Sequence, residues 1–212
     1  MINFKNIDLT YNNKKIIEQL SFSVEKGDKI AILGKSGLGK SSLFQLILGF
    51  AKAQQGEVCF NDVLVDEKTV WEIRKQIAFI DQDVSIGEGK ALDWIHSIFD
   101  FKINASEAFP KKELEQLLEY FELSRDELEK NIGSLSGGER QRLAIIAAIL
   151  LKRKVFLFDE ITSALDAHLK QKVVDFFTQN KEWTVIVISH DAVWLKHPQV
   201  KVFDLKEKQW EQ

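Results

Sequence analysis

A glycine-rich segment carries the residues of this chain that are best suited to hold phosphate groups. In order, it reads Gly34, Lys35, Ser36, Gly37, Leu38, Gly39, Lys40, Ser41 and Ser42. Glycines let the backbone curl so that successive N–H groups point inward around an anion. Lys40 would then reach the terminal phosphates of a nucleotide, and the Ser41 hydroxyl would ligate Mg²⁺. The spacing predicts a phosphate-binding loop, which by itself leaves kinases, GTPases and transport ATPases open.

The residues on either side of this loop predict the elements that position it. Residues 29–33 are a short apolar run, typical of a strand that is buried on both faces. Residues 41–48 predict a helix that Gly49 ends, and the positive end of its dipole would point at a bound phosphate. A glycine-rich turn with an incidental lysine is the alternative. The strand before the loop and the helix after it favour the phosphate loop.

Two acidic residues follow a second buried-strand pattern. Residues 155–158 are apolar, and Asp159 and Glu160 come directly after them. The carboxyl ends of strands in a parallel sheet line the ligand crevice, and consecutive side chains point to opposite sides. Asp159 is placed to hold Mg²⁺ through water, and Glu160 could orient and polarise the water that attacks a γ-phosphate. The alternative is a polar strand end that is exposed to solvent.

A second candidate anion site lies at residues 135–142, which read Leu-Ser-Gly-Gly-Glu-Arg-Gln-Arg before a long predicted helix. Ser136 and the glycines suit a helix N-terminus that presents N–H groups to an anion. One ATP needs only one cradle around its β- and γ-phosphates. The segment is therefore either an ordinary helix cap or part of a site for a nucleotide that another copy holds, and the residues alone leave both interpretations open.

Length, charge and cysteine content narrow the classes of function. The 212 residues suit one substantial domain, or a core that carries a smaller insertion. The 29 basic and 32 acidic residues give a net charge of −3, without the basic field that a nucleic-acid binder usually has. We therefore expect no nucleic-acid partner and interpret residues 152–154 as solvated basic positions. A single cysteine, Cys59, indicates a reducing compartment, and no apolar stretch reaches the roughly 18 residues that span a bilayer.

Apolar patterns along the chain predict an α/β fold. Strand-like patterns occupy residues 2–9, 16–24, 29–33, 58–65, 77–80, 155–158, 185–188 and 200–205. The early strands look antiparallel, whereas the later strands alternate with helices and imply a largely parallel sheet. Residues 83–135 look helical. We expect one domain over residues 1–212: a P-loop NTPase core with a mixed sheet (1–82 and 152–212), an N-terminal antiparallel β-subdomain and an inserted helical subdomain (about 83–151).

Several motifs, in order along the chain, resemble those of ATP-binding cassette (ABC) proteins, the nucleotide-binding subunits of ABC transporters. Residues 135–139, Leu-Ser-Gly-Gly-Glu, resemble the family signature. Tyr11 sits where the family has an aromatic residue that stacks on adenine, and Gln82 matches the glutamine that contacts Mg²⁺ and senses the transmembrane partner. Residues 163–166 resemble the loop that crosses the dimer interface, and His190 matches the histidine that contacts the γ-phosphate. The resemblance covers nearly the whole chain.

The resemblance implies a full set of site residues. The expected catalytic residues are Glu160, His190 and Lys40. The expected nucleotide contacts are Tyr11, Gly34, Lys35, Ser36, Gly37, Leu38, Gly39, Lys40, Ser41, Ser42, Gln82, Ser136, Gly137, Gly138, Glu139 and Asp166. The expected Mg²⁺ ligands are Ser41, Gln82 and Asp159. ATP and Mg²⁺ are therefore the expected cofactors.

The resemblance also implies partners. Two cassettes would pair head to tail on binding ATP, so that each nucleotide lies between residues 34–42 of one copy and residues 136–139 of the other. Hydrolysis would power a separate transmembrane permease subunit, which would hold the cytoplasmic cassette at the inner face of the cell membrane. A soluble ABC-type ATPase with a non-transport partner is the alternative. A small-molecule or nucleotide kinase is a third class, and the signature argues against it.

The sequence departs from the family pattern at three places. Ile161 stands where the family usually has proline, and it should not touch phosphate. Ala147 occupies a position that is often arginine, which leaves the coupling of the helical lobe less defined. Residues 83–90 lack the proline and Leu-Phe elements often seen after the glutamine. The transport class therefore does not follow from the resemblance.

Overall fold

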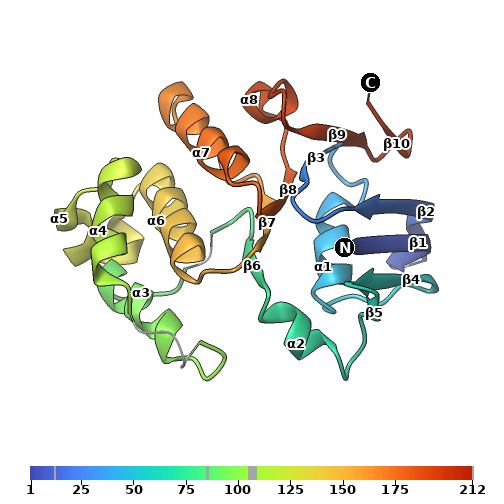
Figure 1. Ribbon diagram of the computed structural model, residues 1–212, viewed down its shortest axis with the longest axis horizontal. Coiled ribbons are helices and arrows are strands. Elements are labelled where there is room, and N and C mark those ends of the chain that lie inside the picture. Colours follow the sequence, from blue (N-terminus) through green and yellow to red (C-terminus); the bar gives the residue numbers. More distant parts are fainter. Residues whose placement is uncertain (12, 85, 105–108, 212) are drawn as a thin grey trace.

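The computed structural model describes residues 1–11, 13–84, 86–104 and 109–211, and its strands form two sheets (Figure 1). Within those residues, the first sheet has four strands in the order β2-β1-β4-β5, and every neighbouring pair is antiparallel. Its strands are β1 (Ile2–Tyr11), β2 (Lys14–Val24), β4 (Gln55–Phe60) and β5 (Val63–Leu64). Buried and exposed residues alternate over much of β1 and β2, as one covered face requires. The predicted N-terminal antiparallel subdomain is confirmed.

The second sheet follows the order β10-β9-β3-β8-β7-β6, and its neighbours are parallel except for the β9–β10 pair. Its strands are β3 (Lys29–Leu33), β6 (Ile77–Ile80), β7 (Val155–Asp159), β8 (Thr184–Ile188), β9 (Lys201–Asp204) and β10 (Gln209–Trp210). Every residue of β7 and β8 is buried, which explains their unbroken apolar runs. The predicted mixed sheet is therefore correct.

Helices cover the parallel sheet and form a lobe at the end of the molecule opposite the antiparallel sheet (Figure 1). Those near the sheets are α1 (Lys40–Ile47), α2 (Val70–Arg74), α7 (Ala167–Gln179) and α8 (Ala192–Leu195). Those of the lobe are α3 (Ala91–Asp100), α4 (Lys111–Tyr120), α5 (Arg125–Glu129), the short 3-10 turn η1 (Ile132–Ser134) and α6 (Gly137–Leu150). Helix α6 contacts α3, α4 and strand β6, so it joins the lobe to the parallel sheet.

The lobe begins later than its helical pattern predicted. No helix covers the described residues between β6 and Lys90, and α3 starts at Ala91. Residues 85 and 105–108 of the expected helical segment lie outside the described residues. A capping box of Ser124 and Glu127 starts α5, and it satisfies N–H groups that the first turn leaves free. In the part of the chain that the structure describes, no helix has the length and apolar character to cross a membrane.

Alternate residues of the central strands enter two different cores. Phe156 and Phe158 of β7 belong to a cluster with α6 and α7, whereas Val155 and Leu157 pack with α1 and the antiparallel sheet. This alternation follows from the strand period of two. The parallel sheet is therefore a buried middle layer, and its strand ends are the places where polar side chains can reach solvent.

The aromatic contact between α7 and β7 generates a stability prediction. Phe177 is fully buried. The centroid of its ring lies 5.1 Å from that of Phe156 and 4.8 Å from that of Phe158, and both pairs meet edge to face. We expect Phe177→Ala to lower the free energy of unfolding by about 3–5 kcal/mol, because it removes a large buried ring and leaves a cavity. Urea denaturation checks this value, with Phe101→Ala as the control because Phe101 is 61% exposed. A loss below about 1 kcal/mol for Phe177→Ala would contradict it.

Candidate functional site

The segment between β3 and α1 forms a tight loop whose shape depends on glycine. Gly37 and Gly39 have φ angles of 81° and 86°, which are in the left-handed region that favours glycine. A Cβ atom on Gly39 would lie 2.5 Å from Cγ2 of Ile16, so the loop also packs closely against β2. Helix α1 begins directly after this glycine, at Lys40. Its first-turn N–H groups therefore face the loop, which is the arrangement of a phosphate site.

Lys40 is buried at the centre of the loop. Its ammonium group donates hydrogen bonds to the carbonyl oxygens of Gly34, at 2.7 Å, and of Lys35, at 3.1 Å. Only 8% of the residue is exposed. A buried ammonium is costly unless it is hydrogen-bonded, so the loop carbonyls hold the charge where phosphate oxygens would bind.

Ser41 and Asp159 meet across a separation of 118 residues. The Ser41 hydroxyl donates to Oδ2 of Asp159 at 2.5 Å. Burial raises the pKa of the Asp159 carboxyl, the hydrogen bond from Ser41 opposes this rise, and the charge of Glu160 adds to it. Mg²⁺ prefers oxygen ligands, and a cation beside these two oxygens would relieve the cost of burying the carboxylate. The residues present therefore fit the expected magnesium ion.

A surface pocket of about 320 Å³ gathers most of the predicted site residues. Its lining residues are Tyr11, Ile16, Ser36, Gly37, Gly39, Lys40, Ser41, Ser42, Gln82, Asp159, Glu160 and His190. They come from the ends of β1, β6, β7 and β8, from the start of β2 and from the phosphate loop with the first turn of α1. Tyr11 at its edge is 43% exposed, and its hydroxyl donates to Gln45 Oε1 at 3.0 Å. The predicted adenine, phosphate, magnesium and water-activating positions thus share one pocket.

One lining residue was not predicted from the sequence. Ile16 looked like an ordinary residue of a half-covered strand, and its position against Gly39 depends on the packing of β2 on the loop. The only signal available was its place in the apolar pattern of residues 16–24. That pattern does not distinguish a core side chain from one that lines a pocket.

Other predicted residues do not line this pocket. Gly34, Lys35 and Leu38 belong to the loop itself, and the first two contribute the carbonyls that hold Lys40. The remaining ones, Ser136, Gly137, Gly138, Glu139 and Asp166, start helices elsewhere on the chain.

The side chains at those helix starts are engaged in capping. Ser136 Oγ accepts from the Glu139 N–H at 3.2 Å, and Glu139 Oε2 accepts from the Ser136 N–H at 2.6 Å. This second contact lowers the pKa of Glu139. Asp166 Oδ1 accepts from the Leu169 N–H at 2.9 Å. Both interpretations of residues 135–142 are therefore compatible: the segment is a capped helix start within this chain, and it lies outside the pocket of its own chain.

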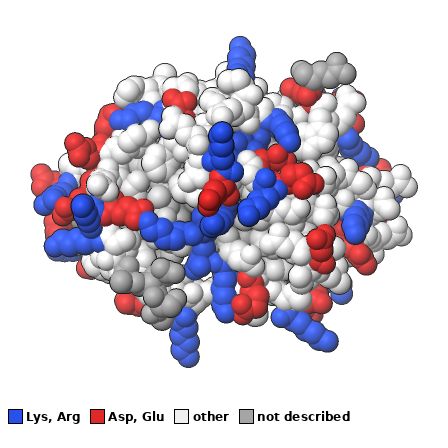
Figure 2. Space-filling model, viewed as in Figure 1, with Lys and Arg blue, Asp and Glu red and all other residues white. Residues whose placement is uncertain are grey.

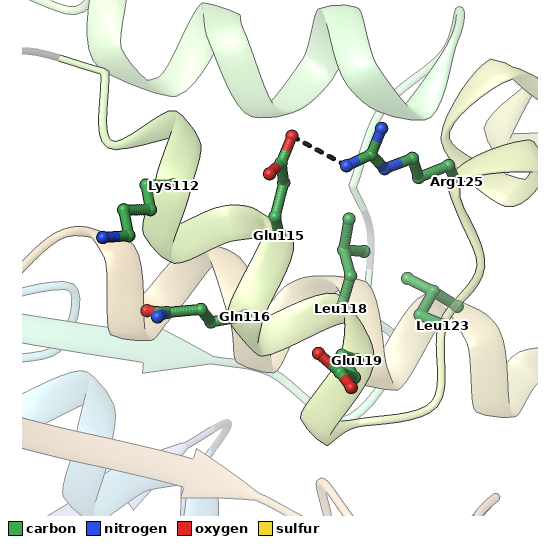
Figure 3. Close-up of a pocket in the computed structure, with 7 residues that line it drawn as sticks. All are labelled: Lys112, Glu115, Gln116, Leu118, Glu119, Leu123 and Arg125. Atoms are coloured by element: carbon green, nitrogen blue, oxygen red, sulfur yellow. Dashed lines mark ion pairs between the residues drawn. The ribbon is translucent and has the colours of Figure 1, made fainter.

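A larger hollow, of about 450 Å³, lies on the helical lobe (Figure 3). Figure 3 shows that α4 supplies most of its wall, including Glu115 and Glu119, and Arg125 of α5 approaches from one side. The Arg125 guanidinium pairs with Glu115 at 2.9 Å. The hollow contains no residue of the phosphate loop, and its two basic side chains, Lys112 and Arg125, are balanced by the two carboxylates, so it has no net positive charge for phosphate. It is therefore not a second candidate for the nucleotide.

Charged side chains of both signs are mixed on the molecular surface. Figure 2 shows basic side chains gathered near the middle of one face, with acidic side chains directly beside them. Within the basic run at residues 152–154, Lys152 is exposed and forms an ion pair with Glu113, which agrees with a solvated position. Arg153 differs from the prediction of a solvated position, because it is partly buried and its guanidinium donates to Asn104 Oδ1.

Comparison with known proteins decides the family. The family model described as ABC transporter matches residues 17–163. The chain belongs to the ABC transporter family. It is the ATPase nucleotide-binding domain of that family, as the signature-like segment indicated. The match includes the phosphate loop, Gln82, the capped start of α6 and the Asp159-Glu160 pair.

Relatives of this cassette include both exporters and importers. A putative export ATP-binding/permease protein of Rickettsia typhi is 35% identical over 200 residues, which are 89% of this chain and 34% of that protein. The energy-coupling factor transporter ATP-binding protein EcfA1 of Oenococcus oeni is 34% identical, over 90% of this chain and 71% of its own length. The methionine import ATP-binding protein MetN of Clostridioides difficile is 33% identical, over 92% of this chain and 63% of its own length. The cassette thus spans about a third of the length of the export ATP-binding/permease relative.

Solved structures agree with the fold. The dimeric structure of MJ0796, described as a bacterial ABC transporter cassette, superposes with a TM-score of 0.84 at 25% identity, over 100% of this chain and 97% of that chain. A dimeric post-hydrolysis state of the same cassette, bound to ADP and Pi, also has a TM-score of 0.84. The arrangement of two sheets and a helical lobe is therefore that of an ABC cassette.

The position of Lys40 generates a binding prediction. A ligand at a hundredfold excess over its Kd stabilises the folded state by about 2.7 kcal/mol. We expect Lys40→Ala to lose most of the melting shift that Mg-ATP produces, because no other buried ammonium lines the pocket among the described residues. Thermal denaturation with and without Mg-ATP measures the shift, and Lys68→Ala, at an exposed lysine, is the control. An undiminished shift in Lys40→Ala would contradict the assignment.

Proposed function

We propose that this cassette binds and hydrolyses Mg-ATP as a dimer and thereby powers a transmembrane permease. The observation that carries the proposal is the single pocket in which the phosphate loop, Ser41 with Asp159, Gln82, Glu160 and His190 meet. A kinase would need an acceptor for the phosphoryl group. Water is the acceptor in this proposal, because the chain belongs to a family of ATPases and Glu160, which can orient water, lines the same pocket.

Each pocket residue has a role in this proposal. The loop N–H groups and Lys40 hold the β- and γ-phosphates, and Tyr11 stacks on adenine. Mg²⁺, held by Ser41, Gln82 and Asp159, would neutralise charge on the phosphates when bound. Glu160 orients a water molecule and accepts its proton as the water oxygen bonds to the γ-phosphorus and the bond to the ADP oxygen breaks. His190 donates to a γ-phosphate oxygen.

The start of α6 supports a dimer with a shared site. Ser136, Gly137, Gly138 and Glu139 begin a 14-residue helix with a positive dipole end, yet they do not line the pocket of their own chain. In the proposed dimer, they complete the phosphate site of the partner copy, and Asp166 lies at the crossing between the copies. The solved neighbour is itself a dimer of cassettes.

An apolar groove along β6 is the proposed docking site of the permease. It has a volume of about 240 Å³ between the parallel sheet and the helical lobe, and its walls include Ile80, Trp94 and the small residue Ala147. Phe79 also lines the groove. It lies on β6, the edge strand of the sheet, and is 40% exposed although its side chain is a large apolar ring. Exposed apolar patches of this kind mark protein interaction sites. The alanine at position 147, where family members often have arginine, leaves the groove open to an apolar segment.

We further propose that the permease is a separate polypeptide that holds the cassette on the cytoplasmic face of the cell membrane. The support is that two relatives, of which this chain covers 71% and 63%, are ATP-binding proteins by name. Fusion to a membrane domain, as in the export ATP-binding/permease relative, is the competing arrangement. Co-purification with a distinct membrane protein tests the two against each other. A cassette that never partitions with membranes would favour a soluble ABC-type ATPase.

The role of Glu160 generates a catalytic prediction. We expect Glu160→Gln to bind Mg-ATP normally, to lower steady-state phosphate release by roughly 10²-fold or more, and to accumulate an ATP-bound dimer. The amide keeps the shape of the carboxylate but cannot accept the proton. Phosphate release and size-exclusion chromatography measure the two effects, with Glu67→Gln as an exposed control. Ordinary turnover in Glu160→Gln would remove this residue from the mechanism.

The groove generates a prediction about the partner. We expect Phe79→Asp to abolish association with the permease while the melting shift with Mg-ATP persists. Docking of the permease would bury the new carboxylate without an opposite charge or hydrogen-bond donor beside it, which costs free energy. Trp210→Ser is a matched control, since Trp210 is 39% exposed and lies on β10 at the opposite edge of the same sheet. Membrane flotation of the two variants measures association. Equal flotation of Phe79→Asp and the unmodified chain would rule out this docking site.

A further inference from the structure

A buried amide connects α6 to the segment that carries Glu160. Gln141 is only 4% exposed, and each end of its side chain is hydrogen-bonded to residues that follow β7. Its Nε2 group donates to Ser163 Oγ at 2.9 Å and lies 3.3 Å from the carbonyl oxygen of Glu160. Its Oε1 atom accepts from the Ala164 N–H at 3.0 Å. One side chain of the helical lobe thus holds both ends of a short turn that starts at the proposed catalytic carboxylate.

The backbone of Glu160 is in a conformation that needs such support. Its φ angle is 51°, in the left-handed region that non-glycine residues adopt only with strain. Its N–H donates to the Ile188 carbonyl of β8 at 2.9 Å, and its carbonyl also accepts from the Ser163 N–H at 3.1 Å. The neighbouring strand holds one side of the peptide, and Gln141 holds the other. The direction of the Glu160 side chain depends on both attachments.

The first turn of α6 rests directly on the same segment. A Cβ atom on Gly138 would lie 2.9 Å from the carbonyl oxygen of Ala164, so the contact excludes any larger residue. Gly138 and Gln141 are three positions apart and therefore share a face of the helix. Because this face of α6 lies so close to the turn, a shift of α6 would displace the turn as well.

The far side of the turn is attached to the segment that carries His190. The Thr162 hydroxyl donates to Oδ2 of Asp191 at 2.5 Å, and Lys170 pairs with Oδ1 of Asp191 at 2.6 Å. Asp191 follows His190 directly. The turn therefore lies between α6 on one side and the histidine on the other.

We propose that Gln141 is a positioning residue for Glu160, and that it transmits movements of the helical lobe to the carboxylate that activates water. The proposal rests on the proposed ATPase function. Glutamine suits the role because its amide is donor and acceptor at once. A carboxylate would place a charge there and lose the donor, and an apolar side chain would leave the Ala164 N–H without its partner.

The kinetic test uses Gln141→Met, which keeps the length of the side chain and removes the amide. We expect kcat to fall about ten- to hundredfold, since small displacements of a catalytic group cost this much, while KM and the Mg-ATP melting shift stay near their original values. Thr178→Val is the control for a lost buried hydrogen bond, because Thr178 is 2% exposed and bonds within α7. A kcat within twofold of the unmodified chain would overturn the proposal.

A double variant distinguishes positioning from a general structural role. If Gln141 acts through Glu160, then Gln141→Met in the Glu160→Gln background should cause no further loss of turnover. A structural role would multiply the two losses instead and would overturn the proposal. If Gln141→Met does not fold, Gln141→Asn replaces it, because its amide is one methylene too short to reach both ends of the turn.

Hydrogen exchange separates this inference from the proposed function. Without nucleotide, we expect the Ala164 amide to exchange faster in Gln141→Met than in the unmodified chain, and to be unchanged in Thr178→Val. Unchanged exchange in Gln141→Met would overturn the contact itself. If the unmodified chain released no phosphate, the proposed function would fail, while the exchange result would still decide whether Gln141 holds the turn.

Discussion

The parallel register of β3, β8 and β7 is the constraint on which the rest of the site depends. Ile32 of β3 and Asp159 of β7 both pair with Ile188 of β8, so the three strands end at the same level. Each of these strands ends in a polar segment: the phosphate loop after β3, Asp159-Glu160 at the end of β7 and His190 after β8. Because parallel strands place their carboxyl ends at one edge, side chains from distant parts of the chain meet in one pocket.

The energetic cost of this pocket is offset by the apolar layers around it. Lys40 and Asp159 are both buried, the pKa of Asp159 is raised, and Glu160 has a strained φ angle. Such features destabilise a fold unless its surroundings hold them in place. Here the surroundings are β7 and β8, all of whose residues are buried, with α1 on one face and α6 and α7 on the other. A site of this kind is ready for a cation and a phosphate, because both would stabilise charges that are already buried.

Much of the fold could be predicted from residue patterns because those patterns are local. Strand alternation, the apolar runs of the parallel strands and the Ser124–Glu127 capping box each depend on neighbours within a few positions. The phosphate loop was predictable for the same reason, since Gly37 and Gly39 meet a local need for positive φ. The helical pattern was extended too far over residues 83–90, because no helix forms in the described part of this segment, where Gly87 and Gly89 have φ angles of 86° and 92° that an α-helix does not use.

By itself, the sequence indicated the chemistry to which its residues are suited: a loop of the phosphate-binding type, oxygen ligands of the kind that Mg²⁺ prefers and an acid after a buried strand. Tertiary structure alone decided which groups share a pocket. Ile16 against Gly39 and Gln141 against the turn after Glu160 carry no local signature, since each contact joins segments that are far apart in the chain. The start of α6 shows the same division: its residue types left a helix cap and an anion site both open, and only the folded chain made clear that this segment lies outside the pocket of its own chain. The physical reason is that hydrogen bonds and packing act through space, whereas propensity and spacing act along the chain.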